Sequence, residues 1–264
     1  MINFGNELLI GRIVNTNGAW LAERLTLLGF DVRRIIVAPD DEEAIEVLRD
    51  ALSRADVVVC TGGLGPTYDD RTAEFLAKAV GKRLVENPEA LEMVRRKYEE
   101  RGLPLTPERR KMALLPEGAK PIPNPVGTAP GILLELDGKI AACLPGVPAE
   151  MKEMFERYVK PVLRRRAPSI CIYEASLVVE GVPESSLAPV IKEVARSCPP
   201  PCYVKSHPKG HEVRAPVLDI RVLGSASGCE EAEAKVREAV RRLREEAERL
   251  KGRVLEERVY RLSD

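Results

Sequence analysis

The fold of this chain is decided by residues 56–72, which read Asp56-Val57-Val58-Val59-Cys60-Thr61-Gly62-Gly63-Leu64-Gly65-Pro66-Thr67-Tyr68-Asp69-Asp70-Arg71-Thr72. The short apolar run at the start is typical of a strand buried in a parallel sheet. A glycine-rich turn follows it, and Asp70 can begin a helix directly after the turn. Ligands of open α/β sheets bind beyond the carboxyl ends of the strands. This stretch therefore predicts a strand–loop–helix unit with a candidate site in its loop.

Strand-like and helix-like segments alternate on both sides of that stretch. Predicted strands cover residues 32–37, 132–136 and 140–144, and predicted helices begin near residues 17, 40, 70, 87, 107 and 148. The alternation predicts the α/β class, with helices on both faces of a mostly parallel sheet. We therefore expect a three-layer α/β/α domain over residues 1–168.

A second domain is predicted after the basic segment 164–168, which ends in proline. The pattern beyond it is strand, helix, strand, strand and helix, and this order predicts a small α+β domain over residues 169–253. In its last helix, residues 229–251, the apolar side chains form one stripe along the helix. Residues 254–264 are predicted to be a C-terminal tail.

Composition excludes several classes of protein. The chain has 41 basic and 41 acidic residues, so its formal net charge is zero. Proteins that bind nucleic acid usually carry a basic stripe, so nucleic acid is not an expected partner. No apolar run approaches the roughly 20 residues that cross a bilayer. The first residues do not resemble a signal peptide, so we expect a cytoplasmic protein without a membrane partner.

The amide and cysteine content bears on temperature and redox state. The sequence contains no glutamine and only six asparagines, which is typical of a hyperthermophile protein. The cytosol of hyperthermophiles is an exception to the rule that intracellular thiols stay reduced. The six cysteines therefore leave the presence of disulfides open.

Five further segments carry polar residues or glycines at predicted strand ends, namely Gly5-Asn6-Glu7, Asn15-Thr16-Asn17, Pro39-Asp40-Asp41, Asn124 to Gly131, and Leu144 to Pro148. They could be ordinary loops and helix caps. Alternatively, their N–H groups bind phosphate and their carboxylates bind a divalent metal or activate water. Two better-known motifs fail at the glycine loop, because it lacks the lysine of a P-loop and the third glycine of a dinucleotide fingerprint.

Together these segments resemble one family. The motifs are Gly-Asn-Glu-Leu-Leu, Asn-Thr-Asn, Thr-Gly-Gly-Leu-Gly-Pro-Thr-x-Asp-Asp, Asn-Pro-Val-Gly-Thr-Ala-Pro-Gly and Leu-Pro-Gly-x-Pro-x-Glu-Met. Residues 1–165 resemble the N-terminal part of CinA-type (competence/damage-inducible) proteins, within the wider molybdopterin-binding fold family. Residues 170–253, including Lys205 to Gly210, resemble the KH-like second domain of the same proteins.

This resemblance implies a site at the glycine-rich loops. In molybdopterin-binding relatives, the aspartates that match Asp70 and Asp40 are essential for adenylyl or metal chemistry on the pterin. In CinA-type proteins, the domain is associated with metal-activated hydrolysis of ADP-ribose to AMP and ribose 5-phosphate. Full-length bacterial CinA proteins also have a C-terminal deamidase domain, for which this sequence is too short. Only four residues precede Gly5, so the true start is expected to lie upstream or the first strand to be frayed.

The predicted function is therefore metal-dependent hydrolysis of ADP-ribose or a related dinucleotide. Asp70 and Asp40 are the predicted catalytic residues, and Asp70 with Asp69 is the predicted ligand set for Mg²⁺ or Co²⁺. The predicted ligand-binding residues are Asn6, Glu7, Asn17, Thr61, Gly62, Gly63, Gly65, Thr72, Gly127, Thr128, Pro145, Gly146 and Pro148. The alternatives are a non-catalytic protein that binds molybdopterin or a nucleotide, and an adenylyltransferase that acts on molybdopterin. The expected partners are a small phosphate-bearing ligand and further copies of the chain, in a dimer or trimer.

Three other interpretations carry less weight. Cys198, Cys202, His207 and His211 have the residue types of a zinc site, but their spacing is shorter than in a zinc finger. A Cys198–Cys202 disulfide and free thiols both remain open. KH domains clamp RNA with a Gly-x-x-Gly loop, and the matching region has one glycine, so RNA binding is not expected.

Overall fold

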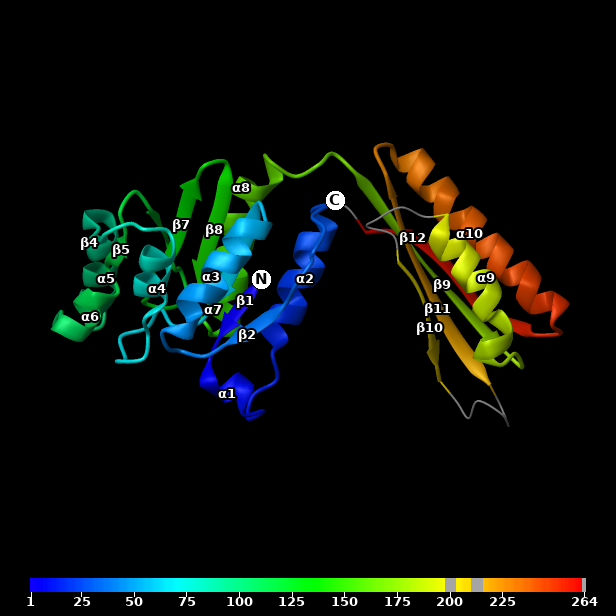
Figure 1. Cartoon of the computed structure of the whole chain (residues 1–264), viewed down its shortest axis with the longest axis horizontal. Coiled ribbons are helices and arrows are strands. Elements are labelled where there is room, and N and C mark those ends of the chain that lie inside the picture. The colour runs from blue at the N-terminus through cyan, green and yellow to red at the C-terminus, as the bar shows by residue number, and fades with distance from the viewer. Residues whose placement is uncertain (198–202, 210–215, 263–264) are drawn as a thin grey trace. The chain divides into compact units, whose positions relative to one another are not determined.

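The computed structural model describes residues 1–197, 203–209 and 216–262, and Figure 1 shows its elements. It contains two compact units, Met1–Glu23 with Val32–Arg166, and Arg24–Asp31 with Ala167–Asp264. The boundary between Arg166 and Ala167 lies within the predicted linker, residues 164–168. None of the described helices combines the length and the apolar character needed to cross a membrane.

The first unit is built on a six-stranded sheet. Its strands are β1 (Ile2–Phe4), β2 (Ile36–Ala38), β3 (Val57–Thr61), β6 (Lys120–Ile122), β7 (Gly131–Leu136) and β8 (Lys139–Leu144). The order across the sheet is β2-β1-β3-β8-β7-β6, in which the first four strands run parallel and β7 and β6 add antiparallel pairs. This confirms the predicted α/β class with a mostly parallel sheet.

The remaining elements of this unit connect and cover the strands. They are α1 (Asn6–Leu9), α2 (Thr16–Leu27), which begins in this unit, α3 (Glu43–Arg54), α4 (Thr72–Ala79), β4 (Leu84–Glu86), α5 (Pro88–Glu99), α6 (Pro107–Lys111), β5 (Leu114–Pro116), α7 (Pro148–Met154), the π-helical turn η1 (Phe155–Val159) and α8 (Lys160–Arg164). The strands β4 and β5 form a separate antiparallel pair. The helix predicted from residue 107 therefore stops early, and the chain turns into β5.

Alternation along β3 divides the core into two faces. Val58 and Cys60 belong to one buried cluster together with side chains of α3, α4 and α5. Val59 is also buried, and its side chain points to the opposite face because successive residues of a strand alternate. On helices of the unit, the rings of Trp20 and Phe155 meet edge to face with centroids 5.5 Å apart. Burial of both faces explains why β3 reads as a continuous apolar run.

The helix predicted over residues 148–165 is interrupted. α7 passes into η1 before α8 begins. Pro161 explains the interruption, because proline lacks the N–H group of a regular helical turn and its ring crowds the carbonyl four residues earlier. Tyr158 lies within the resulting π-helical turn.

The second unit has its own sheet. Its elements are β9 (Cys171–Glu180), α9 (Glu184–Arg196), β10 (Tyr203–Pro208), β11 (Val217–Ala226), α10 (Cys229–Arg249) and β12 (Arg253–Arg261). The order is β10-β11-β9-β12, and all neighbouring strands are antiparallel. Figure 1 shows α9 and α10 on one side of this sheet. This β-α-β-β-α-β order is the split, ferredoxin-like arrangement. It confirms the predicted small α+β domain, and the KH-like assignment stays a prediction.

The predicted tail is also corrected. Residues 253–261 form β12, which pairs antiparallel with β9 along its length. Val254 and Val259 pack against the buried core of the unit. Charged residues separate these two valines, so the segment has no apolar run of its own, and only its pairing with β9 makes it a strand.

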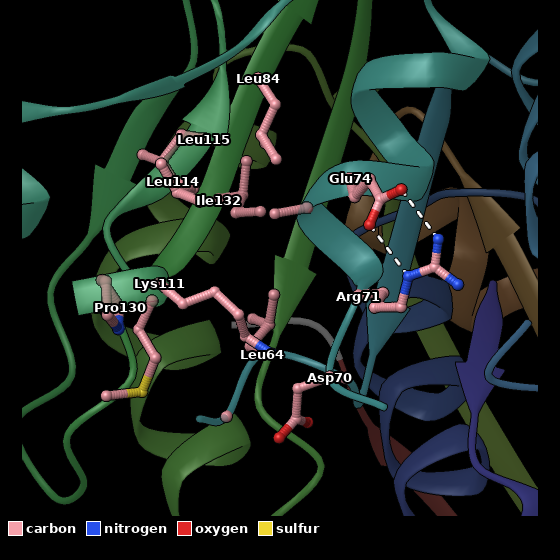
Figure 2. Close-up of a pocket in the computed structure, with 14 residues that line it drawn as sticks. Leu64, Asp70, Arg71, Glu74, Leu84, Lys111, Leu114, Leu115, Pro130 and Ile132 are labelled. Atoms are coloured by element: carbon pink, nitrogen blue, oxygen red, sulfur yellow. Dashed lines mark hydrogen bonds and ion pairs between the residues drawn. The ribbon is translucent and has the colours of Figure 1, made fainter. Parts of the chain in front are cut away.

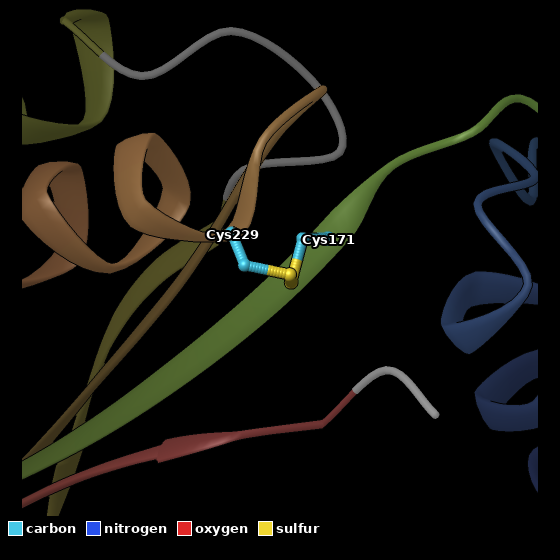
Figure 3. The surroundings of a disulfide bond; sticks show 2 residues. All are labelled: Cys171 and Cys229. Carbon is cyan, nitrogen blue, oxygen red and sulfur yellow. A yellow bond between two sulfur atoms is a disulfide. The ribbon is translucent and has the colours of Figure 1, made fainter.

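A disulfide joins Cys171, the first residue of β9, to Cys229, the first residue of α10 (Figure 3). Their Cα atoms are 5.0 Å apart. Cys60 and Cys143 are free and buried, and they face each other across β3 and β8. The Cys198–Cys202 pair lies outside the described residues, as does His211 of the zinc interpretation. His207 is exposed on β10.

Candidate functional site

Loops after four parallel strands meet at one edge of the first unit's sheet. They follow β1 at Gly5, β2 at Pro39, β3 at Gly62 and β8 at Pro145. The N–H of Gly5 donates to the carbonyl of Ala38 at 3.2 Å. Because the strands are parallel neighbours, their carboxyl ends share this edge. The structure therefore brings together loops that are far apart in the sequence.

The loop after β3 depends on glycine at two consecutive positions. Gly62 and Gly63 have φ angles of +98° and +65°. A Cβ atom on Gly62 would lie 2.4 Å from the carbonyl oxygen of Phe4. The N–H of Gly62 donates to the carbonyl of Leu144 at 3.0 Å, so it is not free for a ligand as predicted. Gly62 instead joins the loop to the end of β8.

The next three N–H groups along the loop are free to bind a ligand. Those of Gly63, Leu64 and Gly65 have no hydrogen-bond acceptor within the described parts of the chain. Such consecutive N–H groups attract anions, and phosphate oxygens in particular. We call residues 63–65 the N–H loop.

The loop after β8 lies against the loop after β3. A Cβ atom on Gly146 would be 3.4 Å from the Cα of Gly62. The amide nitrogen of Asn17, at the start of α2, donates to the carbonyl of Gly146 at 2.7 Å. Because the Nδ2 atom of Asn17 donates this bond, the second atom of its amide group must be the oxygen, Oδ1. That Oδ1 atom is buried and has no donor among the described residues. A buried acceptor without a partner is rare and points to a donor that a ligand would bring.

Two predicted ligand residues instead hold the loop. The hydroxyl of Thr61 accepts from the amide of Asn3 at 2.7 Å, and Asn15 donates to Asn3 at 3.0 Å. The hydroxyl of Thr72 donates to the carbonyl of Gly62 at 2.9 Å. Both threonines are buried. Each hydroxyl thus already has a partner inside the protein, and binding of a ligand by these two threonines stays a prediction.

The amide of Asn3 should therefore be important for stability. We expect Asn3→Leu to lower the free energy of unfolding by about 1–3 kcal/mol, because Thr61 and Asn15 each lose a buried partner. Urea unfolding measures this change. The double variant Asn3→Leu with Thr61→Val should recover part of the loss, since it removes one of the orphaned groups. A single variant as stable as wild type would contradict the role of this network.

Four carboxylates lie at the same edge, namely those of Glu7, Asp40, Asp69 and Asp70. The N–H of Asn6 donates to Asp40 at 3.0 Å. Burial raises the pKa of Asp40 above its usual value, and the negative charges of Glu7, Asp69 and Asp70 raise it further. A hydrogen bond from Thr67 lowers the pKa of Asp69. These opposite shifts in the pKa separate an aspartate that gains a proton readily from one that stays ionised.

Asp70 has a definite local role. Its Oδ2 atom accepts from the N–H of Thr67 at 2.9 Å and from the hydroxyl of Thr67 at 2.6 Å. Among the residues that the structure describes, no three His, Cys, Asp or Glu side chains converge to hold a metal ion. The predicted ligand pair Asp70 and Asp69 is thus part of a turn around Thr67, and the geometry does not support a preformed metal site.

The pKa of Asp40 leads to a pH prediction. The pKa of Asp40 is higher in the folded protein than in the unfolded chain. As the pH rises from the unfolded pKa through the folded pKa, ionisation of Asp40 therefore lowers the stability of the protein. We expect Asp40→Asn to melt at a higher temperature than wild type at pH 7, and the difference to vanish below pH about 3, where both states are protonated. Melting curves from pH 2.5 to 7 measure this. A variant less stable than wild type at pH 7 would contradict the prediction.

A pocket opens beside the N–H loop (Figure 2). Gly63, Gly65 and Asp70 line it, together with apolar side chains of β5 and β7. Lys111, at the end of α6, reaches across it and donates to the carbonyl of Thr67. Arg71 also lines the pocket, but it is paired with Glu74. Lys111 supplies a positive charge that sequence reasoning missed, because α6 is remote from the loop along the chain.

The loop before β7 is held by Asn124, the first residue of the candidate segment Asn124 to Gly131. Asn124 accepts from the N–H of Gly127 at 2.7 Å and donates to Glu150 of α7 at 2.7 Å. The N–H of Gly127 is therefore occupied, which corrects its predicted contact with phosphate. Thr128 accepts from the hydroxyl of Tyr98 at 3.5 Å. Glu150 lies in the first turn of α7, two residues after Pro148, and so ties this loop to the one after β8.

The fold and the site define an open α/β domain with glycine-rich loops at the carboxyl edge of its sheet. Residues 1–165 match the family described as a probable molybdopterin binding domain. This match covers more than half of the chain, and the chain belongs to that family.

The chain is also similar to individual proteins and to a solved structure. A protein of Pyrobaculum aerophilum is 57% identical over 244 residues, which are 92% of this chain and 91% of that protein. One of Aeropyrum pernix is 54% identical over 258 residues, 97% of this chain and 96% of that protein. The solved structure of a CinA protein from Thermoplasma acidophilum, titled as having unknown function, is 46% identical with a TM-score of 0.58. The match covers 61% of this chain and 96% of the CinA chain. The resemblance to CinA-type proteins is confirmed.

Proposed function

We propose that the first unit binds a small ligand that combines phosphate with a pterin or nucleoside. The proposal rests mainly on the N–H loop and the buried oxygen of Asn17, which flank the contact between Gly62 and Gly146. The N–H groups suit phosphate oxygens. The amide oxygen suits an N–H or O–H donor, which pterins, adenine and ribose all carry. The family description supports a molybdopterin-type ligand among these.

Calorimetric titration with AMP, ADP-ribose and a phosphorylated pterin tests this proposal. We expect at least one of them to bind the wild-type protein. Asn17→Asp should bind it less tightly, because a carboxylate repels a phosphate nearby. Asn87→Asp is the matched control, since Asn87 caps α5 through a bond to the N–H of Ala90. Equal affinities of the two variants, or no binding by wild type, would overturn the proposal.

Hydrolysis of a phosphoanhydride is the reaction that we propose for this site. The raised pKa of Asp40 favours it as the group that takes a proton from water. The water oxygen would bond to one phosphorus of ADP-ribose, the bridging P–O bond would break, and AMP and ribose 5-phosphate would leave. The alternatives are binding without reaction and adenylyl transfer to molybdopterin.

Chromatography for AMP after incubation with ADP-ribose distinguishes these reactions. Mg²⁺ and Co²⁺ enter the assay as variables, because the sequence analysis predicts a metal-dependent reaction. Asp70→Asn should abolish turnover and keep the fold, whereas Asp137→Asn, in the β7–β8 hairpin turn, should leave turnover unchanged. Absence of AMP under all conditions would favour a binding protein. Dimer or trimer formation remains a prediction, which light scattering measures.

A further inference from the structure

The sheet of the second unit ends in two edge strands, β10 and β12. β10 contains Lys205 and Pro208, and these residue types are typical of an edge that does not pair further. β12 has neither lysine nor proline among its nine residues. Its register shift lies between Val254 and Glu256, so residues 257–261 form a regular stretch beyond the shift. This stretch of β12 is therefore the edge that suits the addition of another strand.

Alternate residues of this stretch direct their backbone groups away from the sheet. The N–H of Leu262 donates to the carbonyl of Ile172 at 2.9 Å, so Leu262 forms its bonds with β9. Bonded residues recur at every second position of an antiparallel ladder. No strand in the described parts of the chain pairs with the other side of β12. The residues whose N–H and C=O groups point to that side are Glu257, Val259 and Arg261.

The side chains of this stretch are complementary to a second copy of themselves. Two identical edges related by a two-fold axis pair antiparallel, and their outward-pointing residues must lie opposite each other. When Val259 lies opposite Val259 of the second copy, Glu257 lies opposite Arg261 of the second copy, and symmetry gives this ion pair twice. Arg258 then lies opposite the ring of Tyr260 of the second copy. Such cross-strand pairs stabilise a sheet.

Other registers of the same two edges are less favourable. Centring the pair on Glu257 would place two carboxylates opposite each other, and centring it on Arg258 would oppose two guanidinium groups. Centring it on Tyr260 brings no opposite charges together. Val259 already packs against the buried core of the unit. The register centred on Val259 therefore joins apolar side chains in its middle and opposite charges on either side of them.

We propose that residues 257–261 pair antiparallel with the same residues of a second copy of this chain, so that two second units share one continuous sheet. The charges are available for this contact. Glu257 is 3.2 Å from Arg244 but remains 31% exposed, and Arg258 is 71% exposed beside Glu256. So short a stretch buries little area, and the dimer should dissociate on dilution. The proposal does not depend on the proposed function of the first unit.

Charge reversal tests this register. Sedimentation velocity of the full chain over a range of concentrations should show a reversible dimer. Glu257→Arg and Arg261→Glu should each raise the dissociation constant about tenfold or more, because each puts like charges opposite each other at two symmetric places. Glu238→Arg is the matched control, since Glu238 pairs with Arg241 within α10, and it should dimerise like wild type.

Mixing the two single variants gives the sharpest result. In a mixed dimer of Glu257→Arg with Arg261→Glu, every reversed charge again lies opposite a charge of the other sign. An equimolar mixture should therefore dimerise within about threefold of wild type. Single variants that dimerise like the control, or a mixture as weak as the single variants, would overturn the register. A wild-type chain that is monomeric at every concentration would overturn the interface.

Amide hydrogen exchange tests the interface without any substitution. The N–H of Val259 points outward in one copy and is bonded in the dimer, whereas the N–H of Tyr260 faces β9 in both states. Dilution of wild type should speed exchange at Val259 about tenfold or more and leave Tyr260 unchanged. Exchange at Val259 that does not respond to dilution, while the chain dissociates, would show that the copies associate elsewhere and would overturn the proposal.

Discussion

Gly62→Ala is expected to destabilise the first unit by about 3 kcal/mol or more and to abolish ligand binding. Two effects add. Alanine is strained at a φ angle of +98°, which costs of order 1–3 kcal/mol. Its Cβ atom would also lie 2.4 Å from the carbonyl oxygen of Phe4, and this backbone atom of β1 cannot move aside as a side chain can. Either the loop or the strand must shift, and both form the site.

The two effects can be separated with a matched glycine. Gly81, after α4, has a φ angle of +67° and nothing within 4 Å of its would-be Cβ atom. Gly81→Ala should therefore show only the backbone strain, about 1 kcal/mol, with binding unchanged. Urea unfolding and calorimetric titration of both variants measure the difference. If the Gly62 variant were no less stable than the Gly81 variant, the close approach of the loop to β1 would be wrong.

Loss of the Cys171–Cys229 disulfide should have the second large effect. The bond closes a loop with a sequence separation of 58 residues, and it restricts the unfolded chain more than the folded one. By loop-closure entropy its removal lowers the free energy of unfolding by about 4 kcal/mol. For a unit of this size, that corresponds to a fall in melting temperature of about 15–30 °C.

Calorimetry of the Cys171→Ala, Cys229→Ala double variant measures this effect. We expect the transition of the second unit to move to lower temperature, while that of the first unit stays in place. A reducing agent should lower the melting temperature of wild type and leave the double variant nearly unchanged. A wild-type protein in which mass spectrometry finds free thiols at both positions would refute the bond.

Much of the first unit follows from local sequence. Val57 to Cys60 predict a buried strand because apolar residues on both faces need cover on both faces, and the structure places β3 inside the sheet. The glycines after Thr61 predict a special turn, and two of them have positive φ angles. Since parallel strands share an edge, the motifs at several strand ends also predict that their loops meet.

Other features of the site could not be predicted in this way. Lys111 and Glu150 lie on helices that reach the site only through the packing of the domain. Thr61 and Thr72 carry hydroxyls that suit a ligand, yet buried partners use both. Residue type indicates that a group can form a hydrogen bond, but the partner depends on which segments pack beside it.

The amino-acid order by itself thus determined the α/β class, the central strand and the edge at which the loops gather, because apolar periodicity and glycine act on neighbouring residues. Tertiary structure alone decided which N–H groups stay free, that Cys171 pairs with Cys229, and that residues 253–261 form an edge strand. Each of these depends on the register between segments that are distant along the chain. That register is set when the core packs as a whole, and no short stretch of sequence contains it.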